Sequence, residues 1–99
     1  MRIITISTLG KRGRFGNQMF QYAFARAYAE KYNCILQTPK WIGQDIFEIQ
    51  DPLITNKLPQ VNCEREYPNG RINIDLLGYF QNYRSLSIMT KTWLKIFIK

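Results

Sequence analysis

Residues 2–38, RIITISTLGKRGRFGNQMFQYAFARAYAEKYNCILQT, decide the fold. Arg2–Ser7 alternates mostly β-branched side chains between two faces, which predicts a strand. Gln18–Tyr32 carries an apolar stripe at helical spacing, which predicts a helix that packs on a sheet. The stripe is formed by Phe20, Ala23, Phe24, Ala27 and Tyr28. Cys34–Thr38 is a second short strand, so this segment is a βαβ unit with parallel strands.

The rest of the chain is less regular but supports the same class. Trp41–Phe47 predicts a short helix, and the prolines at 52, 59 and 68 suggest loops around one short extended piece. Arg71–Gly78 alternates apolar and polar residues and predicts another strand. Ser85–Lys99 predicts a helix with Leu86, Met89, Trp93 and Phe97 on one face. We therefore expect an α/β fold with three parallel strands.

A glycine-rich basic loop, Thr8–Gly16, joins the first strand to the first helix. Asn17 is a good residue type for the helix N-cap. A loop between a strand's carboxyl end and a helix N-terminus is a usual place for an anionic ligand. Gly13 and Gly16 permit close backbone approach, and the cations of the loop add positive charge. These cations are Lys11, Arg12 and Arg14.

The common nucleotide-binding motifs do not fit this loop. Its glycines lie at 10, 13 and 16, which is not the G-x-G-x-x-G of dinucleotide-binding proteins. The acidic residue expected after the second strand is also absent, because Leu36-Gln37-Thr38 stands there. No Gly-Lys-Ser/Thr follows Gly10 at the P-loop spacing. Typical NAD and ATP sites are therefore disfavoured.

The charge is uneven and limits the classes of partner. The 99 residues carry a net charge of +7, with positive ends and a slightly negative middle. A phosphate-bearing ligand suits such a field, whether nucleotide, nucleic acid or membrane surface, but a solvated basic face or an interface suits it equally well. The chain has no His, and its two cysteines form no CxxC pair, so a zinc site is disfavoured.

The two thiols and the apolar runs bear on location. We expect Cys34 and Cys63 to be reduced in a cytoplasmic protein, with Cys34 as a small core residue. The first residues lack the apolar stretch of a signal peptide, and no run reaches the ~20 apolar residues of a transmembrane helix.

Two segments resemble one enzyme family. GRFGNQMFQYAFARAYA (residues 13–29) strongly resembles the N-terminal signature of glycosyltransferase family 11, the α-1,2-fucosyltransferase type. Its first six residues are also similar to a loop of protein O-fucosyltransferases. INIDLLGYFQNYRSL (residues 72–86) is similar to a later strand-loop segment of family 11. The matches occur in the correct order, while residues 39–70 match only loosely.

The resemblance implies a Rossmann-like βαβ half-domain, similar to the N-terminal domain of a GT-B glycosyltransferase. It implies metal-independent, inverting transfer of fucose from GDP-fucose to a glycan hydroxyl of a galactoside, with no cofactor. The donor-binding residues implied are Gly13, Arg14, Phe15, Gly16, Asn17 and Gln18. Arg14 and Asn17 are the best catalytic candidates, because donors there could stabilise charge on the departing GDP. Tyr79 and Gln81 are candidates for the acceptor side, and Asp75 is a weaker candidate acid.

One element of the family is absent. Its second domain carries H-x-R-R-x-D, which this chain cannot contain because it has no His. We therefore expect residues 1–99 to be an N-terminal, mainly acceptor-side domain, apparently truncated and inactive alone, whose missing half is a further chain or domain. One alternative is a small basic module that binds nucleic acid or another phosphate-bearing ligand. Another is that the Lys-striped terminal helix lies peripherally at a membrane surface.

Overall fold

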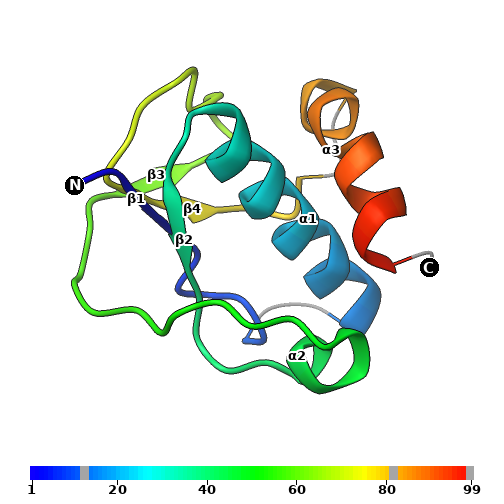
Figure 1. Cartoon of the computed structure of the whole chain (residues 1–99). Coiled ribbons are helices and arrows are strands. Elements are labelled where there is room, and N and C mark those ends of the chain that lie inside the picture. Colours follow the sequence, from blue (N-terminus) through cyan, green and yellow to red (C-terminus); the bar gives the residue numbers. More distant parts are fainter. Residues whose placement is uncertain (12–13, 81–82, 98–99) are drawn as a thin grey trace.

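The computed structural model describes residues 1–11, 14–80 and 83–97, and these form a four-stranded parallel sheet with helices (Figure 1). The strands are β1 (Ile3–Thr5), β2 (Ile35–Gln37), β3 (Gln60–Asn62) and β4 (Ile74–Leu77). The helices are α1 (Phe15–Lys31), α2 (Ile42–Phe47) and α3 (Tyr83–Phe97). Strand order across the sheet is β2-β1-β4-β3. The expected α/β class is confirmed.

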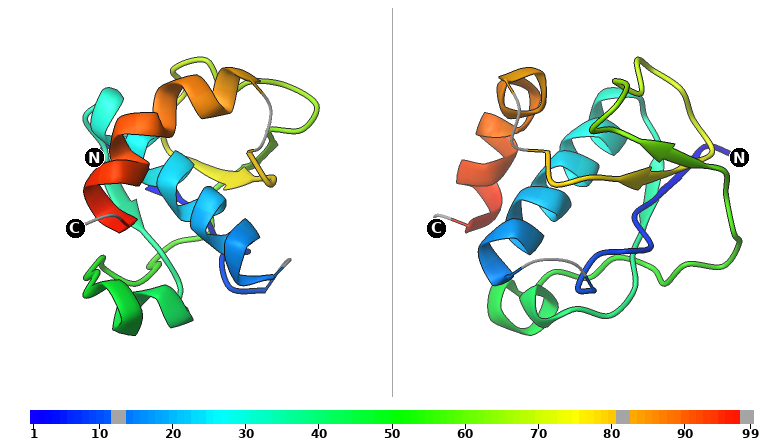
Figure 2. Two further views of the ribbon diagram at one scale, coloured as in Figure 1. Left: turned by 90° about the vertical axis from the view of Figure 1, so that its right-hand side faces the viewer. Right: turned by 180° about the vertical axis from the view of Figure 1, so that it is seen from behind.

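The helices α1 and α3 lie on the same side of the sheet (Figures 1 and 2). The chain between β2 and β3 crosses from one edge of the sheet to the other. Its segment Ile54–Gln60 lines a cavity with Thr5, Ser7 and Asp75, whose side chains point away from α1. Among the described residues, this second face is therefore covered by extended chain, whereas both faces of a parallel sheet usually carry helices.

The core lies between the sheet and α1. On this face β1 buries Ile4, β2 buries Leu36 and β4 buries Leu76, each at most 2% exposed. The alternation of the strands places these side chains on one face, as the sequence predicts. The opposing stripe of α1 is buried too, including Ala23, Phe24, Ala27 and Tyr28. Its alanines allow the helix to approach the strands closely, because they add little volume at the contact.

The start of α1 differs from the sequence prediction. The helix begins at Phe15, and Arg14 occupies the N-cap position without a side-chain capping hydrogen bond. Asn17 therefore lies within the first turn, so its prediction as the N-cap is wrong. The physical reason is tertiary: the Phe15 ring stacks on Phe47, with centroids 6.1 Å apart, and packs against Trp41. These contacts favour an earlier start than the capping preference of Asn17 predicts.

The sheet has one strand more than predicted. The short extended piece between Pro59 and Pro68 is β3, and it pairs with β4 along Gln60–Asn62. Because β3 has only three residues, its alternation is too short to identify a strand from the sequence. The last strand is also shorter than predicted, since Asn73 has a positive φ of 57° directly before β4.

Aromatic contacts attach α3 to the rest of the molecule. Trp93 packs on Phe20 of α1 with ring centroids 4.8 Å apart, and Phe97 contacts Phe47 of α2 at 4.6 Å. Met89 is 1% exposed. The apolar face predicted for this helix therefore packs on α1 and α2 through Trp93 and Phe97. Leu86 lies outside the side chains that the structure describes.

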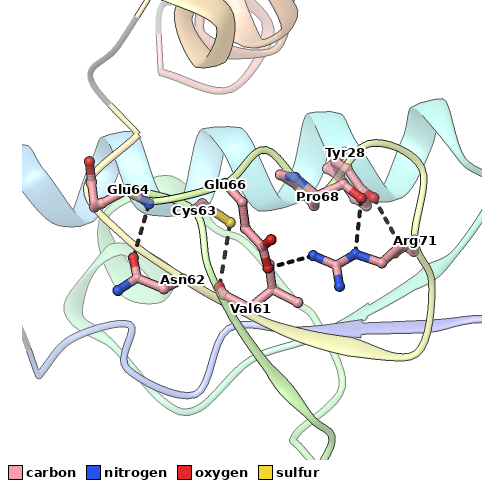
Figure 3. A network of polar contacts seen from close by, with 8 residues as sticks. All are labelled: Tyr28, Val61, Asn62, Cys63, Glu64, Glu66, Pro68 and Arg71. Atoms are coloured by element: carbon pink, nitrogen blue, oxygen red, sulfur yellow. Dashed lines mark hydrogen bonds and ion pairs between the residues drawn. The ribbon is translucent and has the colours of Figure 1, made fainter.

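The loop that returns from β3 to β4 is tied to α1 (Figure 3). The Tyr28 hydroxyl donates to the carbonyl oxygen of Arg71 at 2.7 Å. The Arg71 guanidinium in turn contacts Glu66 at 2.9 Å and donates to the Pro68 carbonyl at 3.4 Å. These contacts hold an irregular segment against the helix, and burial raises the pKa of the Tyr28 phenol.

A largely buried ion pair joins α1 to the connection between β2 and β3. Asp51 accepts a hydrogen bond from the Tyr22 hydroxyl at 2.6 Å and pairs with Arg26. The Asp51 side chain is only 4% exposed and that of Arg26 is 24% exposed. Burial, followed by the hydrogen bond to Asp51, raises the pKa of the Tyr22 phenol. The cluster holds the β2–β3 connection against the helix.

We expect Asp51→Asn to lower the free energy of unfolding by about 3 kcal/mol, because the partly buried Arg26 charge loses its partner. Urea unfolding followed by circular dichroism measures the loss. Glu66→Gln is the matched control at the exposed Arg71 pair and should cost at most about 1 kcal/mol. Equal losses in the two variants would contradict a special role for the buried pair.

Gly43→Ala should also destabilise the fold, by about 1–3 kcal/mol, because overpacking forces a shift of neighbouring side chains. A Cβ at Gly43 would come closer than 3.0 Å to the indole of Trp41, which is 6% exposed. At Gly16, where a Cβ would meet nothing within 4 Å, the same change should gain about 0.5–1 kcal/mol of helix stability. Thermal melts of both variants test the contrast, and a neutral Gly43→Ala would refute it.

Candidate functional site

The loops that follow the strands meet at one edge of the sheet. All strands are parallel, so their carboxyl ends point the same way. The loop after β1 leads into α1 there, and the loop after β2 leads into α2. In open α/β sheets this edge is where ligands bind. A ligand site is therefore expected at this edge.

The loop after β1 is a tight turn that presses on Trp41. The Leu9 N–H donates to the Ile6 carbonyl at 3.1 Å, and the Lys11 N–H donates to the Thr8 carbonyl at 2.9 Å. Gly10 has a φ of +84°, and a Cβ there would lie 3.2 Å from the Trp41 Cβ. A left-handed backbone this close to the Cβ and main chain of Trp41 requires glycine at this position.

The predicted donor-binding residues divide into exposed and packed positions. Arg14 and Gly16 are exposed at the start of α1, while Asn17 and Gln18 are half-buried in its first turn. Phe15 belongs to the aromatic cluster with Trp41 and Phe47, so it serves packing. Gly13 lies outside the described residues. The structure thus places Arg14, Gly16, Asn17 and Gln18 together around one helix terminus.

The electrostatics of this terminus favour an anion. The first turn of α1 contains no acidic residue, and its N–H groups add the positive end of the helix dipole. The side chains of Lys11, Arg14 and Lys40 are exposed on the loops at this edge. No carboxylate in the first turn of α1 would therefore compete with a bound anion for these N–H groups and cations.

The predicted acceptor side is held separately. The Tyr79 N–H donates to Glu64 at 2.6 Å, and the next residue, Phe80, stacks on Phe24 with centroids 4.3 Å apart. Phe24 is nine residues beyond Phe15, or about 13 Å along the helix axis. Tyr79 is thus anchored beside the middle of α1 rather than beside Arg14. Gln81 lies outside the described residues.

Asp75 has a structural position. It is 5% exposed and accepts hydrogen bonds from the hydroxyls of Thr5 and Ser7, at 2.7 and 2.6 Å. It also accepts from the Ser7 N–H at 2.8 Å and the Gln60 amide at 3.1 Å. Four donors occupy the lone pairs that a proton-accepting base would need free. Asp75 therefore joins β1, β3 and β4, and it is poorly suited to be a catalytic base.

Sequence reasoning missed the cavity beside this carboxylate. It measures about 700 Å³ and lies between the Ile54–Gln60 segment, the end of β1 and the start of β4. The sequence does indicate that Thr5 and Ser7 lie together on the second face of the sheet, because they alternate with the buried Ile4 and Ile6. Trp41 was also missed as the residue that fills the space between the loops after β1 and β2. Nothing in the local pattern marks an indole as the filler.

The two cysteines differ in burial. Cys63 is buried, while Cys34 is half-buried at the margin of the core, so the prediction of Cys34 as a core residue is wrong. Cys34 directly precedes β2 at a sheet edge, and there its side chain keeps contact with solvent. Burial raises the pKa of the Cys63 thiol to about 11.

Comparison with known proteins gives no relative: no family model, no curated protein and no solved structure matches the chain significantly. In the described ranges no cluster of three or more His, Cys, Asp or Glu side chains could hold a metal ion. No helix there is long and apolar enough to cross a bilayer. The function must therefore be argued from the residues of the carboxyl edge.

The raised pKa of Cys63 predicts unequal thiol reactivity. Near pH 8, iodoacetamide should modify Cys34 in the folded chain and leave Cys63 intact, because the thiolate is the nucleophile. The rate at Cys63 should rise about tenfold per pH unit until the pH passes its raised pKa. Peptide mass spectrometry after timed quenching measures both rates.

The control for this experiment is the unfolded chain in urea, where both thiols should react at similar rates. Cys34→Ser should leave a single slow thiol in the folded state. Fast modification of Cys63 at neutral pH without unfolding would contradict its buried environment.

Proposed function

We propose that this chain forms one wall of the donor site of a glycosyltransferase of the family 11, α-1,2-fucosyltransferase type. The observation that carries the proposal is the position of the signature. Residues 14–18, which resemble that family's donor loop, form the start of α1 at the carboxyl edge of a parallel sheet. The same proposal assigns the fold to the N-terminal Rossmann-like half of a GT-B enzyme.

The chemistry of this edge suits a diphosphate. When the glycosidic bond of GDP-fucose breaks, negative charge accumulates on the departing GDP. The exposed Arg14 guanidinium and the first-turn N–H groups of α1 can donate to that charge. Stabilising charge that develops in the transition state is electrostatic catalysis. The proposed reaction needs no metal, and Arg14 is the residue for which this role is most direct.

The geometry supports an assignment of the other parts of the proposed site. Asn17 and Gln18 are the amides nearest to Arg14 on α1, and we assign them to the donor. Tyr79 belongs to a separate acceptor region, because Phe80 anchors it beside the middle of α1. The family's second donor element contains a histidine, and these 99 residues have none. The proposal therefore assigns the opposite wall to polypeptide outside this sequence, and catalysis to the combination. A nucleotide donor and two thiols without a disulfide suit the cytoplasm, which we propose as its location.

The experiment is a titration of the ¹⁵N-labelled chain with GDP-fucose, GDP and a short RNA, each at two salt concentrations. Half of a site binds weakly, so the nucleotides should reach about 10 mM. We expect GDP and GDP-fucose to shift the amide signals of Arg14, Gly16 and Asn17. Arg14→Ala should weaken binding about tenfold, since a charge-assisted hydrogen bond contributes roughly 1.5–3 kcal/mol. Asn17→Ala should weaken it as well.

Lys31→Ala is the matched control, because it removes an exposed cation from the last turn of the same helix. It should leave nucleotide affinity unchanged. Salt-sensitive RNA binding without nucleotide shifts would favour the alternative basic module instead. Absence of shifts at residues 14–18 at the highest nucleotide concentration would refute the proposed donor site.

A further inference from the structure

An apolar groove with exposed rims lies where the end of α3 meets α2. Ile46 and Phe47 of α2, its C-cap residue Glu48, and Ile96 and Phe97 of α3 line it, so one charged side chain stands among four apolar ones, and its volume is about 290 Å³. Figure 2 (left) shows the last turn of α3 directly above α2. The Phe47–Phe97 contact forms the floor of this junction, with ring centroids 4.6 Å apart. The groove is thus built from well-packed aromatic side chains.

Large apolar side chains stand exposed on both rims. Ile42 and Ile46 on α2 are 57% and 54% exposed, and Leu94 on α3 is 51% exposed. Leu94 and Phe97 are neighbours on α3, because they are three residues apart. Leu94 therefore places an exposed apolar side chain on α3 next to Phe97 of the groove. Exposed apolar side chains gathered beside a groove on a small protein mark an interaction site more often than isolated apolar residues do.

The two rims carry opposite charge. The charged residues from Ile42 to Glu48 are Asp45 and Glu48, both exposed. The charged residues from Ile88 to Phe97 are Lys91 and Lys95, also exposed. Within the described ranges none of these four side chains forms an ion pair. The exposed charges of α2 and its C-cap are therefore acidic, with Glu48 at the groove itself, and those of the described part of α3 are basic.

We propose that this groove is the interface of a homodimer, in which a second copy of the chain packs across it in a two-fold arrangement. A two-fold axis through the apolar centre brings the acidic α2 rim of each copy to the basic α3 rim of the other. One surface thereby supplies both partners of each charge pair. An anionic membrane fits less well, because it would repel Asp45 and Glu48.

The charge of the whole chain opposes this association. Two copies of net charge +7 repel each other, and salt screens this repulsion beyond about 8 Å at physiological ionic strength. The rim charges act at closer range than that distance. We therefore expect the dissociation constant of the dimer to be lower at about 0.15 M salt than at low ionic strength, because salt screens the repulsion between the two net charges.

Sedimentation equilibrium over about 10 μM to 1 mM protein tests the proposal, because weak interfaces dissociate in this range. The wild-type chain should show a reversible monomer–dimer equilibrium. Ile46→Glu and Leu94→Glu should each raise the dissociation constant at least about tenfold. Ile35→Glu is the matched control, since Ile35 is an apolar side chain 47% exposed on β2, away from the groove. Circular dichroism confirms that each variant is folded.

Charge exchange gives the sharper result. Asp45→Lys and Lys95→Glu should each weaken the dimer several-fold, and the double variant should recover most of the wild-type affinity. A chain that stays monomeric up to the highest concentration overturns the proposal. Self-association that is indifferent to Ile46→Glu and Leu94→Glu overturns it as well. Binding to vesicles of anionic lipid that depends on Leu94, without dimerisation, would assign the groove to a membrane instead.

Discussion

The carboxylate of Asp75 is the point on which the arrangement of the sheet depends. It lies on β4 and accepts hydrogen bonds from Thr5 at the end of β1, from Ser7 just after β1, and from Gln60 at the start of β3. One side chain thus links β1, β3 and β4, although β1 is far from the other two strands in the sequence. Since Ser7 is also the first turn residue after β1, the same carboxylate directs the loop that leads to α1. The position of the proposed GDP-fucose site therefore depends on Asp75, whose carboxylate oxygens already accept four hydrogen bonds.

The β1-α1-β2 unit could be predicted from the sequence because its signals are local. The stripe of α1 runs from Phe20 to Tyr28, about two and a half turns, and the strands on both sides alternate in phase with one buried face. The start of α1 could not be predicted, because it depends on Phe15 finding Phe47 and Trp41 across the fold. For the same reason β3 was not identified: three residues acquire their identity as a strand only by pairing with β4.

The candidate site shows the same division. The sequence places a basic loop and a helix terminus next to each other, and the structure keeps Arg14 and Gly16 exposed there. The sequence does not reveal that Phe15 serves packing, that Asp75 is occupied by four donors, or that Tyr79 is held beside the middle of α1. Each of these depends on a partner more than twelve residues away. Residue type and order therefore indicate a kind of ligand, while the division of roles requires the three-dimensional contacts.

The long crossover from β2 to β3 has a consequence for how the chain assembles. Residues 1–38 contain a complete strand-helix-strand unit whose contacts are close in sequence, so they can form early. The connection from β2 to β3 spans the whole sheet, and β3 can join the sheet only once β4, the next strand in the chain, has paired with β1. The edge that carries β3 closes last and should open first when the native state fluctuates. From the order of strands in space we therefore expect residues 1–38 to fold first and the β3 edge to exchange its amide hydrogens fastest among the strands.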